Sequence, residues 1–163
     1  MSYCIQIIFC PVQRVIKIKI RRNDWIEEDK LAKYIEIPGS MLELAKYGLC
    51  ELPVLILEFE LDAILVQQFA EDLCCCIALG GATKKPGTFI YTILKKAPFI
   101  LFSLDYDKVG ILAFKWWKKI YDKIILWFSP IEKSAGDAYK AGIDLRQWVK
   151  EGIDYAKSVL NNI

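Results

Sequence analysis

Histidine is absent from all 163 residues of the sequence. Its absence removes the usual general base near neutral pH, the commonest metal ligand in proteins, and every Ser-His or Cys-His catalytic arrangement. The sequence therefore favours a non-enzymatic protein that carries no cofactor.

A strong excess of one charge is also missing. The chain has 22 Lys and Arg against 20 Asp and Glu, a net charge of +2, so it exerts no global attraction on nucleic acid or anionic lipid. Any such binding has to be local. Long uncharged apolar runs are missing too, because central charges, which cost about 2.5–3.5 kcal/mol each in a membrane, interrupt the best candidate, residues 109–128. The sequence predicts no transmembrane span.

The first residues, MSYCIQIIFCPVQR, lack the basic region, apolar stretch and small-residue cleavage site of a signal peptide. We therefore expect an intracellular location, either cytoplasmic or virion-associated. A composition rich in Ile and Lys, with six cysteines, is compatible with a viral or mobile-element protein. Three consecutive cysteines, Cys74 to Cys76, would point about 100° apart on a helix and could not all face one ion, so we expect reduced, buried thiols.

Hydrophobic periodicity predicts strands and helices without the steady alternation of a doubly wound sheet. We expect an α+β fold with a mainly antiparallel sheet of about five strands packed by helices, followed by two long C-terminal helices. Residues 1–163 are expected to form a single domain, whose last helix covers about 131–160. The expected strands are 3–9, 14–20, 55–62, 88–94 and 99–104, and the longer expected helices are 63–79, 108–128 and 131–160.

The last expected helix offers the first candidate functional surface. Small and apolar residues recur there at spacings of three and four, which places them on one face, and glycine inside a helix costs about 0.5–1 kcal/mol relative to alanine. This face predicts close packing with another helix, either of the same domain or of another chain. The leading hypothesis is a non-enzymatic interaction or structural protein, acting as a homo-oligomer or as a subunit of a larger, viral assembly. The residues of this face are Ala138, Gly142, Leu145, Trp148, Val149, Gly152 and Ala156.

A basic hairpin near the N-terminus is the second candidate. Its alternating cations could lie along phosphates, which would make the chain a small nucleic-acid-binding regulator, although no recognition motif accompanies them. A basic edge strand also protects a sheet against aggregation, so nucleic acid is not the favoured partner. The residues are Arg14, Lys17, Lys19, Arg21 and Arg22.

An acidic cluster is the third candidate. Alternation predicts that three carboxylates share one face of the strand 55–62, while two more stand at the start of the helix 108–128. Carboxylates of this kind can hold Mg²⁺ for phosphoryl-transfer or nuclease chemistry. A solvated sheet face and a helix N-terminus explain them equally well. The residues are Glu58, Glu60, Asp62, Asp105 and Asp107.

The segment GGATKKPG at residues 80–87 contains glycines and lysines but does not match the phosphate-binding loop of nucleotide hydrolases. We interpret it as a mobile connection and assign it no nucleotide.

Overall fold

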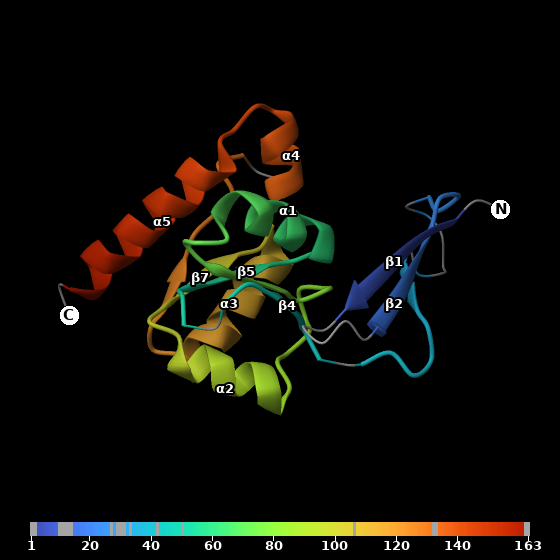
Figure 1. Ribbon diagram of the computed structural model, residues 1–163, viewed down its shortest axis with the longest axis horizontal. Helices are drawn as coiled ribbons and strands as arrows, with labels where there is room; N and C mark the ends of the chain where they lie inside the picture. Colours follow the sequence, from blue (N-terminus) through green and yellow to red (C-terminus); the bar gives the residue numbers. More distant parts are fainter. Residues whose placement is uncertain are drawn as a thin grey trace. The chain divides into compact units, whose positions relative to one another are not determined.

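The computed structural model describes residues 3–9, 15–26, 28, 32, 34–41, 43–49, 51–105, 107–131 and 134–161. Its contacts divide the chain into two compact units, residues 1–42 and 43–163. The expectation of a single domain over the whole chain stays a prediction, and each unit is described by itself (Figure 1).

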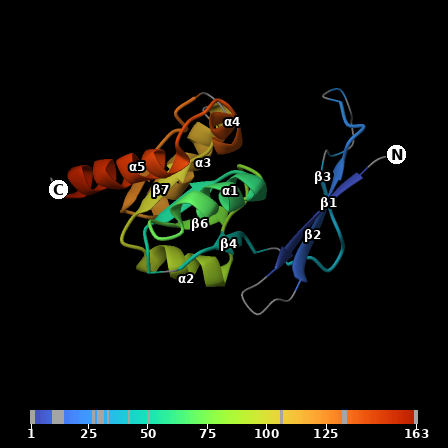
Figure 2. The same ribbon diagram turned by 45° about the horizontal axis from the view of Figure 1, so that its top comes forward.

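The first unit is a three-stranded antiparallel sheet in the order β1-β2-β3 (Figure 2). An irregularity between Ile8 and Phe9 interrupts the pairing of β1 with β2. After β3 the chain returns along β2, where the hydroxyl of Ser40 accepts a hydrogen bond from the backbone N–H of Ile18 at 3.2 Å. The strands are β1 (Tyr3–Phe9), β2 (Val15–Arg22) and β3 (Tyr34–Glu36).

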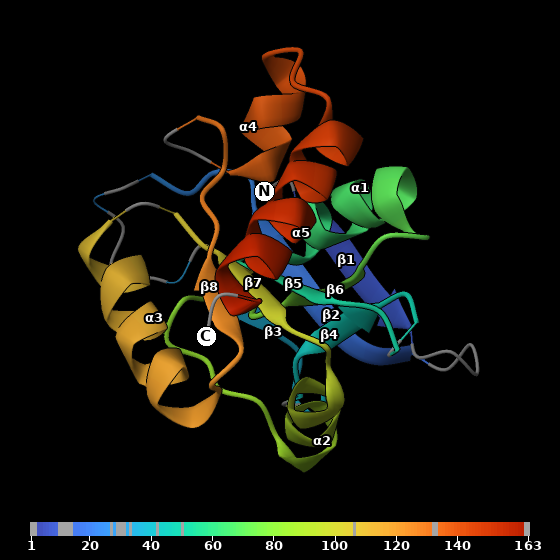
Figure 3. The same cartoon turned by 90° about the vertical axis from the view of Figure 1, so that its left-hand side faces the viewer.

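The second unit is a five-stranded sheet in the order β4-β6-β5-β7-β8. β5, β6, β7 and β8 run parallel, and only β4 is antiparallel to its neighbour, β6. Helices α1, α4 and α5 cover one face of the sheet, and α2 and α3 cover the other (Figure 1 and Figure 3). The strands are β4 (Ala45–Tyr47), β5 (Val54–Leu57), β6 (Cys75–Ala78), β7 (Ile100–Ser103) and β8 (Ile124–Leu126). The helices are α1 (Glu60–Ala70), α2 (Thr88–Lys96), α3 (Lys108–Ile120), α4 (Ala135–Lys140) and α5 (Leu145–Leu160).

The expected α+β class is confirmed, and the sheet of this unit has five strands, but only the expected strands 55–62 and 99–104 contribute to it, through β5 and β7. The expectation of a mainly antiparallel sheet is wrong. Residues 63–79, expected as one helix, contain most of α1 and all of β6, and residues 108–128 contain both α3 and β8. Conversely, residues 88–94, expected as a strand, lie in α2. Short strands buried on both faces are wholly apolar, so periodicity alone cannot separate them from a neighbouring helix.

The core of the second unit is built on its central strands. Every residue of β5, β6 and β7 is buried. Cys74, Cys75 and Cys76 are fully buried free thiols in and before β6, so they act as small apolar side chains of a strand rather than of a helix. Burial on both faces accounts for the absence of a polar/apolar alternation in these strands.

The single helix expected over about 131–160 is in fact two helices. Gly142, with φ +85°, and the following residues separate α4 from α5. The side chain of Asp144 caps α5 by accepting a hydrogen bond from the backbone N–H of Gln147 at 3.0 Å. A glycine with positive φ is a common C-terminal end of a helix. The hydrophobic periodicity of the sequence continues from α4 into α5 because each helix buries one face.

The Gly/Ala-rich face of the C-terminal helices is turned into its own domain. Gly142 is exposed, but the other members of the predicted interaction surface are buried within the second unit. At Gly152 an added Cβ would lie 2.6 Å from Nε1 of Trp127, which explains the glycine in mid-helix. The buried members are Ala138, Leu145, Trp148, Val149, Gly152 and Ala156.

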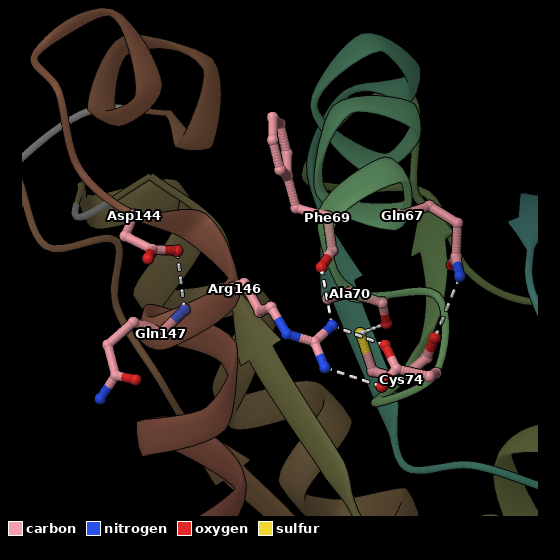
Figure 4. A network of polar contacts seen from close by, with 8 residues as sticks. Gln67, Phe69, Ala70, Cys74, Asp144, Arg146 and Gln147 are labelled. Atoms are coloured by element: carbon pink, nitrogen blue, oxygen red, sulfur yellow. Dashed lines mark hydrogen bonds and ion pairs between the residues drawn. The ribbon is translucent and has the colours of Figure 1, made fainter.

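Polar contacts tie α5 to the end of α1 (Figure 4). Arg146 donates two hydrogen bonds to the carboxylate of Asp72, at 2.6 and 2.7 Å, and a third to the backbone carbonyl of Phe69 at 3.0 Å. This fork-like pairing fixes the direction of α5 over the sheet more than it adds to stability, because the pair is exposed to solvent. No helix among the described residues is long and apolar enough to cross a membrane.

Gly152→Ala tests the internal packing of α5. The added methyl group overlaps the Trp127 ring, so the substitution should lower the free energy of unfolding by about 1–3 kcal/mol, although alanine is the better helix former. Urea unfolding measures this change. Lys150→Ala, on the exposed side of the same helix, should change it by less than about 0.5 kcal/mol. A stabilised Gly152→Ala variant would contradict the packing.

Candidate functional site

The topology of the second unit defines one edge of the sheet where a site is expected. From β5 the chain crosses through α1 to β6 on one side, whereas from β7 it crosses through α3 to β8 on the other side. β5 and β7 are adjacent and parallel, so their carboxyl ends meet at the point where the crossovers diverge (Figure 3). In open sheets of this type ligands bind in the crevice outside such a point.

Carboxylates occupy this crevice. Glu58 directly follows β5, Asp105 lies two residues after the end of β7, and Asp107 precedes the first residue of α3. Burial, with the negative charges of Asp105, Asp107 and Asp62, raises the pKa of Glu58 to about 7. These side chains are therefore close enough to repel one another, although the backbone N–H of Asp105 partly offsets the effect by donating to Glu58.

The α1 side of the crevice adds Asp62. Its Oδ1 accepts a hydrogen bond from the backbone N–H of Gly136 at 2.9 Å, yet burial and the charges of Asp105 and Asp137 still raise its pKa. The pKa of Asp105 is raised by burial, then by Asp107 and Asp137. Asp137 of α4 is thus a further member of the acidic cluster. The sequence interpretation missed it, because only the path of the chain after β8 brings α4 to this edge of the sheet.

The start of α3 holds the second half of the cluster in position. One oxygen of Asp107 accepts from the backbone N–H of Gly110 at 2.7 Å, so this side chain is the N-cap of α3. The expectation of a helix start at this position is confirmed, and the cap leaves the second oxygen able to take another ligand. A Cβ at Gly110 would overlap the carbonyl oxygen of Asp105, which shows how tightly the loop wraps over the helix.

The sequence grouped Glu60 with the cluster, but the structure places it elsewhere. Glu60 is the buried first residue of α1, and its charge, after burial, contributes to raising the pKa of Tyr47 in β4. It does not contribute to the raised pKa of Glu58. The segment 58–62 is the start of a helix and not a strand, so Glu58, Glu60 and Asp62 do not share a face.

The donor set of the crevice fits a hard divalent cation. Carboxylate oxygens are the ligands that Mg²⁺ takes, and among the described residues no lysine or arginine contributes to the pKa shifts of Glu58, Asp62 and Asp105. A small cavity of about 10 Å³, lined by Glu58, Asp62, Asp105 and Ser129, is about the size of one water-sized sphere. The buried hydroxyl oxygen of Ser129 has no hydrogen-bond partner in the described part of the chain. Among the described residues no three acidic, His or Cys side chains form a ready-made metal site, so the carboxylates would have to turn toward an ion.

The basic hairpin does not present a continuous row of cations. Lys17 and Lys19 pair with Glu36 of β3, with Nζ–Oε1 distances of 4.0 and 3.8 Å, and Arg22 pairs with Asp24 at 3.4 Å. Arg21 lies in β2 opposite Tyr34 of β3, and Arg14 is outside the described residues. Ion pairs within the hairpin unit therefore neutralise part of the positive charge that was expected to bind phosphates.

The raised pKa of Glu58 gives the protein a specific pH dependence. The folded chain holds a proton between pH 4.5, the ordinary glutamate value, and about 7, whereas the unfolded chain has lost it. Stability should therefore fall as the pH rises through this window, by up to about 2 kcal/mol after allowance for screening of the half-buried group. Urea unfolding from pH 4 to 8 should show a flatter profile for Glu58→Gln than for the wild type, while Glu151→Gln on exposed α5 keeps the wild-type slope. Equal slopes for Glu58→Gln and wild type would refute the assignment.

Gly110→Ala should displace the loop that carries Asp105. The methyl group must push the Asp105 carbonyl away, which costs about 1–3 kcal/mol in unfolding free energy and separates this carboxylate from Glu58. The pH dependence assigned to Glu58 should therefore weaken as well. Lys108→Ala, on the exposed first position of the same helix, is the control and should leave both properties unchanged. Wild-type behaviour of Gly110→Ala would contradict the close contact.

Several solved structures of primases share the fold of this chain. The primase fragment of the bacteriophage T7 primase-helicase matches 93% of this chain with a TM-score of 0.66 and 15% identity, and the chain covers 62% of that fragment. The RNA polymerase domain of Mycobacterium tuberculosis primase DnaG matches 95% of it with a TM-score of 0.67 and 15% identity, and 58% of that domain is covered. The same domain solved with a double-stranded DNA oligomer that has a 6-nucleotide overhang gives a TM-score of 0.63, 12% identity and coverage of 94% and 53%. The chain thus spans less than two thirds of these proteins.

No protein-family model and no curated protein matches the sequence. At these identities the likeness concerns the fold alone, which resembles that of primase catalytic domains. It nevertheless contradicts the leading hypothesis of a non-enzymatic structural or interaction protein, because the structures that share the fold are primase domains. The burial of the helical face removes the sequence argument for that hypothesis as well. The sequence did not favour nucleic acid as a partner, whereas two of the similar structures were solved with an RNA/DNA hybrid and with a double-stranded DNA oligomer.

Proposed function

We propose that the second unit is the catalytic part of a metal-dependent enzyme that transfers phosphoryl groups on nucleic acid. One observation carries the proposal: Glu58 and the pair Asp105 and Asp107 stand at the carboxyl ends of two adjacent parallel strands, where the crossovers diverge. The likeness to primase domains supports nucleic acid as the substrate class.

The cluster offers distinct tasks to its members. Asp105 and Asp107 lie on one short loop, fixed by the α3 cap, and would hold a divalent cation such as Mg²⁺. When bound, such a cation polarises a phosphoryl oxygen and neutralises charge that develops on it. Asp62, fixed by Gly136, would complete the ligand set from the opposite side of the crevice.

Glu58 is suited to proton transfer. A carboxyl group with a pKa of about 7 can both accept and release a proton near neutral pH, which glutamate in water cannot do efficiently. In this proposal Glu58 takes the proton from the attacking hydroxyl or water. A bound cation would lower its pKa again, so proton transfer and cation binding are coupled through the same charges.

Cation binding and turnover test the proposal together. Isothermal titration with Mg²⁺ and Mn²⁺ should show binding to the full chain and its loss in Asp105→Asn. With a labelled single strand and ribonucleoside triphosphates, Glu58→Gln and Asp105→Asn should each lower the rate of extension or cleavage by about 100-fold or more. The products decide between nucleotide addition and strand hydrolysis.

A matched control uses carboxylates outside the crevice. Glu151→Gln and Asp154→Asn remove the same charge from exposed positions of α5 and should leave cation binding and rate unchanged. Absence of cation binding by the wild type, or full activity of Asp105→Asn, would rule the proposal out.

A further inference from the structure

A second cavity lies beside the acidic crevice, on the α2/α3 side of the sheet. Its volume of about 340 Å³ falls at the lower end of the range of small-molecule sites, roughly 300–1,000 Å³. The loop after β6, with Lys84 and Lys85, forms one wall, and Val109, Leu112 and Trp116 of α3 form the other. Val109 and Leu112 are 45% and 64% exposed, so the apolar wall is open to solvent.

The position of this cavity follows from the parallel sheet. β6 and β7 both run parallel to β5, so the loop after β6 and the start of α3 lie at the same edge as Glu58 and Asp105. Trp116 is nine residues beyond the cap residue Asp107 on one continuous helix, roughly 14 Å along the axis. At ~3.4 Å per stacked nucleotide, that distance is about four nucleotides of one strand.

The chemistry of the walls matches a nucleotide unit. Trp116 is a flat aromatic surface whose orientation is fixed by edge contact with buried Trp117, at 5.6 Å between ring centroids. The ammonium of Lys85 lies 4.4 Å from the centroid of the Trp116 ring, so a cation and an aromatic face stand together. Bases stack on such faces regardless of sequence, while neighbouring lysines meet their phosphates.

The N-terminus of α2 is not the phosphate contact. Glu43 already accepts hydrogen bonds there from the backbone N–H groups of Gly87, at 2.7 Å, and Ile90, at 3.5 Å. Positive charge for a phosphate is left to the lysines of the loop.

We propose that this cavity, the Trp116 pocket, binds an unpaired base of a single-stranded nucleic acid whose phosphates lie along Lys84 and Lys85. A base that enters displaces the Lys85 ammonium from the ring toward the adjoining phosphate. The strand then continues along α3 toward the acidic crevice. This inference rests on the proposed function, because it assumes that the acidic crevice acts on nucleic acid.

Strand binding is measured with the full chain in EDTA, so that it does not depend on metal chemistry. A fluorescently labelled 12-nucleotide single strand should quench tryptophan fluorescence and bind about tenfold more weakly to Trp116→Leu, which should also lose most of the quench. Trp116→Phe keeps an aromatic plane and should restore binding to within about threefold of wild type. Equal affinity of wild type and a folded Trp116→Leu overturns the pocket, and a free mononucleotide that quenches as strongly as the 12-mer overturns the strand as its occupant.

The lysines are tested by salt dependence. Lys84→Gln with Lys85→Gln should reduce the slope of log affinity against log salt by about 1.4, or about 0.7 for each phosphate that the variant no longer neutralises. The matched control, Lys150→Gln with Lys157→Gln, removes two exposed charges from α5 on the other face of the sheet (Figure 3) and should leave the slope unchanged. Equal slopes in both double variants overturn the phosphate contact.

The pocket and the proposed function can fail separately. Glu58→Gln should bind the strand in EDTA as the wild type does, while losing turnover. Normal strand binding without any turnover in Mg²⁺ would leave the pocket standing and remove the catalytic proposal. If the protein turns over substrate but Trp116→Leu does not weaken strand binding, the catalytic proposal stands and the pocket is removed.

Discussion

The parallel hydrogen bonding of β5 to both of its neighbours is the constraint on which the rest of the second unit depends. Val54 to Leu57 pair in register with β6 on one side and with β7 on the other, and all four residues are buried. A strand held in this way has no freedom to slip, because a one-residue shift would turn its side chains to the opposite helical layer. The residues that follow each strand are therefore fixed at one edge, and Glu58 and Asp105 approach each other although 47 positions separate them.

The acidic crevice destabilises the fold that this pairing holds together. Bringing several carboxylates together at the end of a buried strand raises their pKa values, which means that the folded chain loses stability when all of them are ionised. The backbone donors of Gly136 and Asp105, and the cap at Gly110, offset part of that repulsion without removing it. Carboxylates with raised pKa values of this kind are concentrated at functional sites. A bound divalent cation would relieve their mutual repulsion directly.

The sequence allowed some of these features to be predicted and concealed others. The class, strands β1, β2 and β7, and the carboxylates themselves were accessible, because charge at the start of a helix and strong apolar runs are local signals. The orientation of the sheet was not, because β6 and β8 are four and three residues long and continue the apolar patterns of α1 and α3. Without those strands the β/α alternation disappears, and the carboxylates cannot be seen to converge.

The glycines of α5 and α3 show why the acidic cluster replaced the C-terminal helical face as the leading candidate site. Glycine in a helix indicates close approach of another group, but the sequence does not say which group. At Gly152 it is the Trp127 ring of the same domain, and at Gly110 it is the backbone that carries Asp105. The first glycine concerns only packing, whereas the second holds an acidic residue at the edge of the sheet. Because α3 begins just after Asp107 and continues past Trp116, it gives the crevice and the pocket a common rigid support.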